Sequence, residues 1–304
     1  MLLSRIKLIL ILCSPAVIWG ILFIVAKQVL NEISPLYLAI LRYGPATILI
    51  VIILYFIEGK KSFKINKEFL IVAGIGAGAM FGFNVLVWIG VGMSNGIIAS
   101  IFQPLMPLIG VLITFIFFKQ KYNVLTFIII LIAFFGVLLA SSKGDLSFLT
   151  SSDSLGVLFI FVGVFVSTFA GILSQRFKSF SMLRYTAVTN GAGLILFCLL
   201  AILGYVTDSV PVPSFDNLEH IKWEMLYIVI FTGPLPLFLW YKGFAIIGTV
   251  NGMLLNNLVP LVTITGSIFL GYHVGSFEVI GSLVIISAMF LHYFNVKRTT
   301  HVLD

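Results

Sequence analysis

Long apolar runs, each close to 20 residues and free of acidic side chains in its middle, recur along the whole chain. A stretch of about 20 apolar residues is long enough to cross the hydrocarbon core of a bilayer as a helix. Of the 304 residues, 60% are hydrophobic and only 10% are charged, whereas a soluble domain carries about 25% charged residues. The sequence therefore predicts an all-α integral membrane protein.

Ten such runs are separated by short segments that contain proline, glycine, asparagine or charged residues. The first run is longer than the apolar core of a signal peptide and no cleavage site follows it, so we expect it to be the first membrane helix. With boundaries good to about two to four residues, the predicted membrane helices cover residues 8–28, 35–57, 69–92, 96–118, 124–141, 155–175, 182–206, 224–242, 250–271 and 276–295.

Lysine and arginine are distributed unevenly among the connecting segments. With the N-terminus in the cytoplasm, 14 of the 18 basic residues fall on the cytoplasmic side, and Lys27, Arg42, Lys143 and Lys222 fall on the other. Short loops rich in lysine and arginine remain in the cytoplasm. We therefore expect a multi-pass protein of the inner (plasma) membrane with both termini cytoplasmic. The same loops account for the net charge of +7, so we expect no nucleic-acid partner.

Two segments match each other at a constant spacing. Residues 92–110 and 248–266 share identities at Gly92, Asn95, Gly96, Pro104, Leu105 and Gly110 in the first copy. The match pairs the fourth predicted helix with the ninth, so each half holds five spans and the second half enters the membrane upside down. The prediction is ten transmembrane helices as two inverted five-helix repeats, residues 1–148 and 149–304. Inverted repeats are typical of transporters, whose substrate site lies near the midplane.

Short motifs mark the first, second, fourth and ninth predicted helices. They are Trp19-Gly20-x-x-Phe23-x-x-x-Lys27, Arg42-Tyr43, Asn95-Gly96-x-x-Ala99-Ser100-x-x-x-Pro104-x-x-Pro107, and Asn251-Gly252 with Pro260. With these motifs the chain resembles the EamA-type branch of the drug/metabolite transporter superfamily over nearly its whole length. The resemblance implies a secondary transporter that moves a small organic metabolite by alternating access. Glutamates that the family often has after helices 4 and 9 are replaced here by Gln120 and Tyr272.

Polar and aromatic side chains inside the spans are candidates for binding substrate. They are Trp19, Arg42, Asn84, Trp88, Ser100, Gln103, Tyr241, Asn256 and Asn257. Amides without partners are costly in lipid, which favours a cavity, but the same helix faces are rich in small residues, and close helix packing is the alternative. Arg42 either snorkels to the outer interface and bonds a carbonyl, or contacts an anionic group of the substrate.

The charges also bound the substrate. No acidic residue lies in the middle of a span, which disfavours a bare organic cation, and a multiply charged anion would find only Arg42 and Lys27. A neutral or zwitterionic metabolite fits best, with an amino acid or a derivative as an example. No span has a carboxylate in its interior, Glu278 at the outer end of the last helix is expected to be hydrated, and His292 is the one buried group expected to titrate near neutral pH. We therefore expect weak or no tight proton coupling.

An intramembrane enzyme and a non-transporting receptor or scaffold are the alternatives. An enzyme would need a nucleophile with a base or a metal cluster, but His292 is alone in the last span, and Cys13 and Cys198 lie in separate runs. We therefore expect no enzymatic activity, no cofactor and no metal. The expected partners are a small-molecule substrate and the lipid bilayer, for a monomer or a homodimer.

Overall fold

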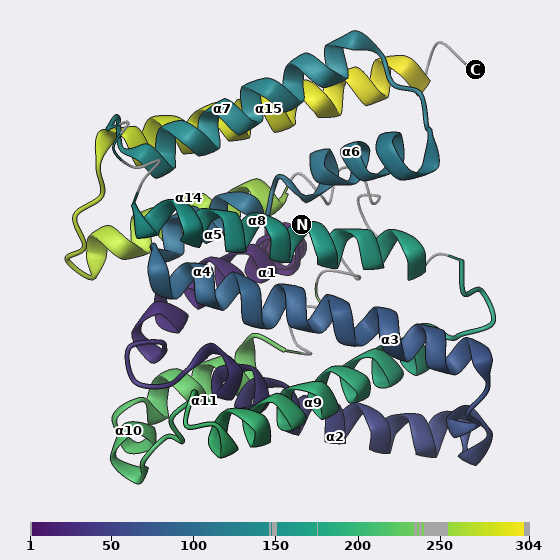
Figure 1. Ribbon diagram of the computed structural model, residues 1–304. Helices are drawn as coiled ribbons and strands as arrows, with labels where there is room; N and C mark the ends of the chain where they lie inside the picture. Colours follow the sequence, from purple (N-terminus) through teal and green to yellow (C-terminus); the bar gives the residue numbers. More distant parts are fainter. Residues whose placement is uncertain are drawn as a thin grey trace. The chain divides into compact units, whose positions relative to one another are not determined.

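The computed structural model describes residues 2–145, 147, 151–174, 176–233, 236, 239 and 255–300. Every regular element in these ranges is helical (Figure 1), which confirms the all-α prediction. The longer helices are α1 (Leu2–Val29), α2 (Pro35–Glu58), α3 (Lys67–Phe81), α6 (Met106–Phe118), α7 (Val124–Ser142), α8 (Ser152–Ser174), α9 (Met182–Val206), α11 (Lys222–Phe231), α14 (Leu258–Phe269) and α15 (Ser276–Thr300). Shorter elements are η1 (Lys60–Phe63), the π-helical turn η2 (Gly82–Leu86), α4 (Val87–Met93), α5 (Gly96–Phe102), α10 (Phe215–His220) and η4 (Leu255–Asn257).

Within the described ranges, seven helices are long and apolar enough to cross a membrane, and the bent pair formed by α5 and α6 raises the number to eight. These eight coincide with predicted spans. The predicted spans 224–242 and 250–271 extend into residues outside the description, so the count of ten remains a prediction. Helix α14 with η4 is a shorter apolar helix, Leu255–Phe269.

Polar caps set where several helices begin. The side chains of Ser34, Asn66, Asn95, Asn123 and Ser181 each accept a hydrogen bond from the backbone N–H three residues further on. Such caps satisfy donors that have no partner inside the helix. The polar breaks seen in the sequence therefore fix the helix starts.

The chain divides into two compact units, each of which takes segments from both halves of the sequence. Unit 1 comprises Met1–Val25, Met93–Val157 and Pro234–Asp304, and unit 2 comprises Ala26–Gly92 and Leu158–Gly233. In unit 1, α7 and α15 lie side by side (Figure 1). Asn295 joins them, because its amide donates to Thr126 Oγ1 at 2.9 Å and its Oδ1 accepts from Asn123 at 2.9 Å.

Helices α1, α5 and α14 also pack closely within unit 1. A Cβ at Gly20 would lie 2.6 Å from the Cβ of Val262, and a Cβ at Gly96 would collide with the Phe23 carbonyl oxygen. Thr263 Oγ1 donates to the Gly20 carbonyl at 2.8 Å. Glycine at these two positions lets the backbones approach, as expected for membrane helices.

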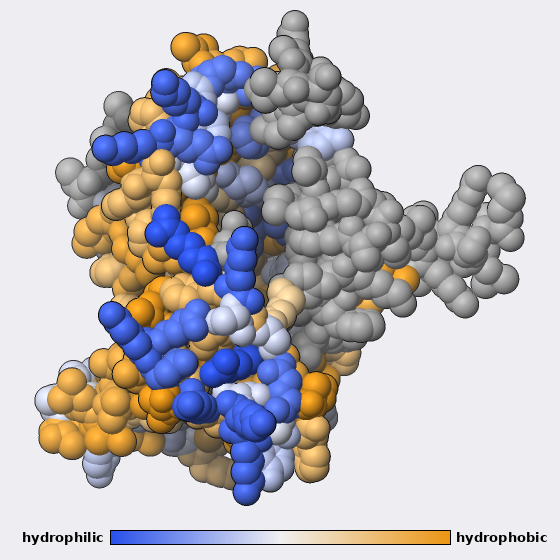
Figure 2. Space-filling view, turned by 90° about the vertical axis from the view of Figure 1, so that its right-hand side faces the viewer, coloured by the Kyte–Doolittle hydropathy of each residue, from blue (hydrophilic) through white to orange (hydrophobic). Residues whose placement is uncertain are grey.

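In unit 2, α9 packs against both α2 and α3. One of its hydrophobic clusters is formed by buried side chains of α2, η2 and α9, namely Leu36, Ala39, Val85, Phe197 and Ala201. Outside such cores, large apolar side chains are widely exposed, for example Phe56 at 79% and Phe269 at 85%. Figure 2 shows hydrophilic residues grouped over part of the viewed surface, while much of the other coloured surface is hydrophobic. Exposure on this scale is expected where lipid replaces water.

Candidate functional site

Arg42 is a buried cation in unit 2. It lies about two turns from the start of α2 and is 7% exposed, so its charge is not carried to an exposed position. Nη2 donates to the Thr232 carbonyl at 3.4 Å, and the guanidinium lies 5.0 Å from the centre of the Tyr43 ring. Among the described residues, Nε and Nη1 have no hydrogen-bond partner. Arg42 therefore holds two buried nitrogen atoms that no described residue accepts from, in a desolvated position.

The partner of Arg42 is the end of a helix. Helix α11 ends at Phe231, three residues before Pro234, and Thr232 is its C-cap. The last carbonyls of a helix lack internal partners and carry partial negative charge, so a cation is stabilised there. Thr232 is 2% exposed, and its own hydroxyl donates to the Ile228 carbonyl at 2.7 Å. The Nη2 atom of Arg42 is thus held by the end of α11, whereas Nε and Nη1 have no hydrogen-bond partner in the described ranges.

Asn84 and Trp88 lie near a π-helical turn in the same unit. Asn84, inside η2, is 1% exposed, and its amide donates to the Met80 carbonyl at 3.1 Å. Its Oδ1 has no hydrogen-bond partner in the described part of the chain. Trp88 follows one turn later and is completely buried, so it is not an aromatic anchor at the surface. Single π turns are found often at functional sites.

Ser100 and Gln103 belong to unit 1, where the fourth predicted span is broken. Helices α5 and α6 meet at an angle of 54°, next to Pro104 and Pro107, which lack the N–H that a continuous helix needs. Ser100 is fully buried, and its hydroxyl donates to the Ile97 carbonyl at 2.7 Å. Gln103 is half-buried at the C-cap of α5. The break places an amide beside irregular backbone.

Trp19, Asn256 and Asn257 lie in unit 1 as well. Asn256 and Asn257 form most of the 3₁₀ turn η4 before α14, and α14 packs against α5. Asn256 is half-buried, and its Oδ1 is buried without a hydrogen-bond partner in the ranges described. Asn257 is 4% exposed and Trp19 is half-buried on α1. Tyr241 lies outside the described residues.

The predicted candidates therefore divide between the two units. Arg42, Asn84 and Trp88 belong to unit 2, and Trp19, Ser100, Gln103, Asn256 and Asn257 belong to unit 1. Their role in binding substrate remains a prediction. In each unit at least one candidate amide keeps a buried oxygen that no described residue satisfies.

The sequence did not indicate that two acidic residues place carboxylate oxygens away from solvent. The sequence predicts a hydrated Glu278, but this residue is 1% exposed, so that prediction was wrong. Its Oε2 accepts from the Gly275 N–H at 2.8 Å, its Oε1 accepts from the Asn95 amide at 3.0 Å, and Lys143 lies 3.8 Å away. A glutamate three residues into a helix start is the spacing of a capping box, which could have revealed it. Glu224, in the first turn of α11, is half-buried with a buried Oε2 that lacks a partner among the described residues.

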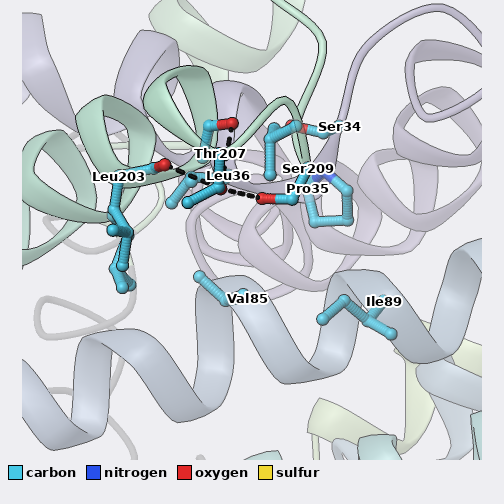
Figure 3. A pocket seen from close by; sticks show the side chains of 11 residues that line it. Ser34, Pro35, Leu36, Val85, Ile89, Leu203, Thr207 and Ser209 are labelled. Atoms are coloured by element: carbon cyan, nitrogen blue, oxygen red, sulfur yellow. Dashed lines mark hydrogen bonds between the residues drawn. The ribbon is translucent and has the colours of Figure 1, made fainter.

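A separate pocket of about 390 Å³ lies in unit 2 at the start of α2 and the end of α9 (Figure 3). Val85 and Ile89 contribute apolar walls from η2 and α4. Its hydroxyls are already used, since Thr207 Oγ1 donates to the Leu203 carbonyl at 2.8 Å and lies 2.8 Å from Ser209 Oγ. None of the predicted candidates is among its lining residues, so the pocket is not favoured as the substrate site.

Long apolar helices, wide apolar exposure and a few buried polar side chains define a multi-pass membrane protein. Residues 6–142 and 154–294 each match the EamA-like transporter family. The chain belongs to this family, is built from two repeats of its domain, and is a membrane transporter.

Two relatives agree with this assignment, and a solved structure has a similar fold. The chain is 34% identical over 283 residues to a Bacillus subtilis (strain 168) protein named uncharacterized transporter YrdR, covering 90% of this chain and 87% of the relative. It is 29% identical to uncharacterized transporter YyaM of the same organism, covering 93% and 92%. A crystal structure aligns with a TM-score of 0.62 at 15% identity, covering 96% of this chain and 98% of the other, which shows a shared fold.

Proposed function

We propose that this protein is a secondary transporter that moves a small neutral or zwitterionic metabolite across the plasma membrane by alternating access. An amino acid or a derivative is an example of this class. In the proposed topology the two family repeats are inverted and both termini are cytoplasmic, as the charge asymmetry of the loops indicates. Neither an enzymatic role nor a scaffold role is favoured by any feature of the described residues.

The observation that carries the proposal is the environment of Arg42. A charged side chain at the centre of a membrane helix costs about 2.5–3.5 kcal/mol on insertion scales. Arg42, about two turns inside α2, bears part of that cost, and leaving its donors unpaired adds to it. One hydrogen bond of 3.4 Å to Thr232 offsets only part of it. A substrate carboxylate or carbonyl accepting from Nε and Nη1 would remove the remaining penalty, which supports a polar substrate with an acceptor group.

Alternating access requires helices that change shape at defined points. The 54° break between α5 and α6 and the π turn η2 are such points, because both leave backbone groups outside the regular ladder. Each lies next to a candidate polar residue, Gln103 in unit 1 and Asn84 in unit 2. Broken helices beside polar groups are the usual construction of transporter sites.

Reconstitution tests the proposal directly. Purified protein in vesicles loaded with a defined mixture of amino acids, dipeptides and other polar metabolites should release a subset of them faster than protein-free vesicles, as measured by mass spectrometry of the external medium. Arg42→Gln should reduce that flux at least about tenfold, which corresponds to a loss of about 1.4 kcal/mol of binding or transition-state stabilisation.

The matched control is Arg184→Gln. Arg184 begins the Arg-Tyr pair of α9, as Arg42 does in α2, but its Nε donates to the Ser62 carbonyl at 2.8 Å near an exposed helix start. We expect its flux to stay within about twofold of the wild type, since no ligand role is assigned to it. Wild-type vesicles that release no metabolite would contradict the transporter proposal. Full flux in Arg42→Gln would instead remove Arg42 from the site.

A further inference from the structure

Arg42 and Glu224 carry opposite charges on two helices of unit 2 that pack against each other, α2 and α11. They form no salt bridge, and each keeps buried polar atoms without a hydrogen-bond partner in the part of the chain that is described: Nε and Nη1 of Arg42, and Oε2 of Glu224. Arg42 has one partner, Thr232, and Glu224 is half-buried, but a charged group that keeps buried polar atoms unpaired is unfavourable. It therefore needs an explanation why Arg42 and Glu224, which carry opposite charges in one unit, do not pair with each other.

The two groups lie at different depths along the same helix pair. The starts of α2 and α11 share one end of unit 2, because Asn217, which precedes α11, donates to Glu32, which precedes α2, at 2.9 Å. Glu224 is in the first turn of α11. The Arg42 guanidinium bonds the other end of α11, at Thr232.

The packed face of α11 connects these two depths. Glu224, Ile228 and Thr232 are four residues apart and share a face, and Ile228 and Thr232 are 0% and 2% exposed. The eight residues from Glu224 to Thr232 rise about 12 Å. Glu224 therefore lies nearer to the end of unit 2 where α2 and α11 begin, and the Arg42 guanidinium lies deeper along the same helix pair.

We propose that Glu224 is a specificity-determining residue that binds a substrate amine while Arg42 binds the carboxylate of the same molecule. The inference rests on the proposed transport function and narrows its substrate class. In an α-amino acid the ammonium and carboxylate groups are attached to the same carbon atom. Such a molecule is too short for the rise of about 12 Å between Glu224 and Thr232, where Arg42 binds. The substrate is a zwitterion whose amine and carboxylate are several atoms apart, such as an ω-amino acid or a dipeptide.

Isomeric probes test the charge spacing. 6-Aminohexanoate and norleucine have the same composition but carry the amine at opposite ends of the chain, and hexanoate lacks the amine. At millimolar concentrations, 6-aminohexanoate should raise the thermal unfolding midpoint of the purified full-length protein by several degrees, because a ligand stabilises the state that it binds. Norleucine and hexanoate should give a smaller shift. Equal shifts with the two isomers, or no shift with any probe, would overturn the proposal.

Substitutions then assign the amine to Glu224. Glu224→Gln should abolish the advantage of 6-aminohexanoate over hexanoate, whereas Glu219→Gln should preserve it. Glu219 is the matched control, because it is exposed and pairs with Lys222 at 2.8 Å. An advantage that survives in Glu224→Gln would refute the assignment. If Arg42→Gln does not fold, Arg42→Lys keeps the charge and should retain a weaker response.

The same probes separate the two proposals. Vesicles that release metabolites but do not distinguish 6-aminohexanoate from norleucine would refute the role of Glu224 and leave the transport function standing. Vesicles that release no metabolite would refute the transport function itself.

Discussion

Replacing Glu278 tests how a buried carboxylate is stabilised in this protein. Its two oxygens accept hydrogen bonds from the Gly275 N–H and the Asn95 amide, and Lys143 lies 3.8 Å from Oε1. The Asn95 amide cannot simply turn over, because its Oδ1 caps α5 by accepting from the Ile98 N–H at 2.9 Å. In Glu278→Gln, the new side chain keeps one acceptor oxygen for two donors, so in either orientation its amide nitrogen would face the donor nitrogen of Asn95 or the N–H of Gly275, with no acceptor between them.

The expected magnitudes follow from burial. A buried donor left without a partner costs about 1–3 kcal/mol, so Glu278→Gln should lower the free energy of unfolding by about that amount. Glu278→Ala leaves both donors without an acceptor and should lower the free energy of unfolding by about 2–4 kcal/mol. This is less than the sum of two full penalties, because Gly275 and Asn95 are only half-buried. The Lys143 side chain is 55% exposed, and ion pairs in contact with water contribute at most about 1 kcal/mol. Lys143→Met should therefore cost less than either change at Glu278.

Unfolding of the purified variants in one detergent, followed by scanning fluorimetry and by denaturant titration, measures these differences. The expected order of destabilisation is Glu278→Ala, then Glu278→Gln, then Lys143→Met. A Lys143→Met variant as unstable as Glu278→Gln would show that the ion pair dominates, and would refute the assignment of the stability to hydrogen bonds. A Glu278→Ala variant as stable as the wild type would refute the buried network altogether.

Three further predictions concern topology, the amides and energy coupling. A reporter fused after Asp304 should be active only in its cytoplasmic form, since 14 of the 18 basic residues lie on the cytoplasmic side of the proposed topology; activity outside would refute that topology. Gln103→Leu and Asn256→Leu should each lower flux in vesicles at least about fivefold while normal amounts of folded protein reach the membrane, because each removes a candidate substrate-binding amide of unit 1; full flux would make both residues structural. A pH gradient imposed without a substrate gradient, at clamped voltage, should drive no uphill accumulation of substrate, and accumulation would show proton coupling.

Apolar run length and polar breaks were sufficient to predict most of the helices. The run 182–206 coincides with α9, Met182–Val206, because serine caps its start and apolar residues continue without interruption. The single span predicted over 96–118 is divided at Gln103 into α5 and α6, and its prolines were the signal. The π turn η2 had no such signal. It lies where the Gly82 backbone meets Gly163 of α8, a contact that local periodicity does not encode.

The candidate site was harder to predict from the sequence, because whether a polar side chain is free to bind a ligand depends on its hydrogen-bond partners in the folded protein. Ser100 and Gln103 looked equivalent on one helix face, yet the Ser100 hydroxyl is used by its own helix. Glu224 is the first residue of the predicted span 224–242, and the sequence places it only at a helix end. Its position on the packed face of α11 depends on how α11 packs against α2. Only the three-dimensional contacts separate polar groups that are satisfied from those that are not.

The burial of Glu278 changes the argument about energy coupling. Weak coupling was predicted in part because this carboxylate would be in water, and that premise was wrong. The contacts give another reason for the same expectation. Glu278 caps the start of α15 through Gly275 and holds Asn95, which in turn caps α5. A residue that delivered a proton in every cycle would have to exchange these partners, and each exchange would leave buried donors unpaired. Glu278 is therefore better suited to holding α5 and α15 together than to carrying protons.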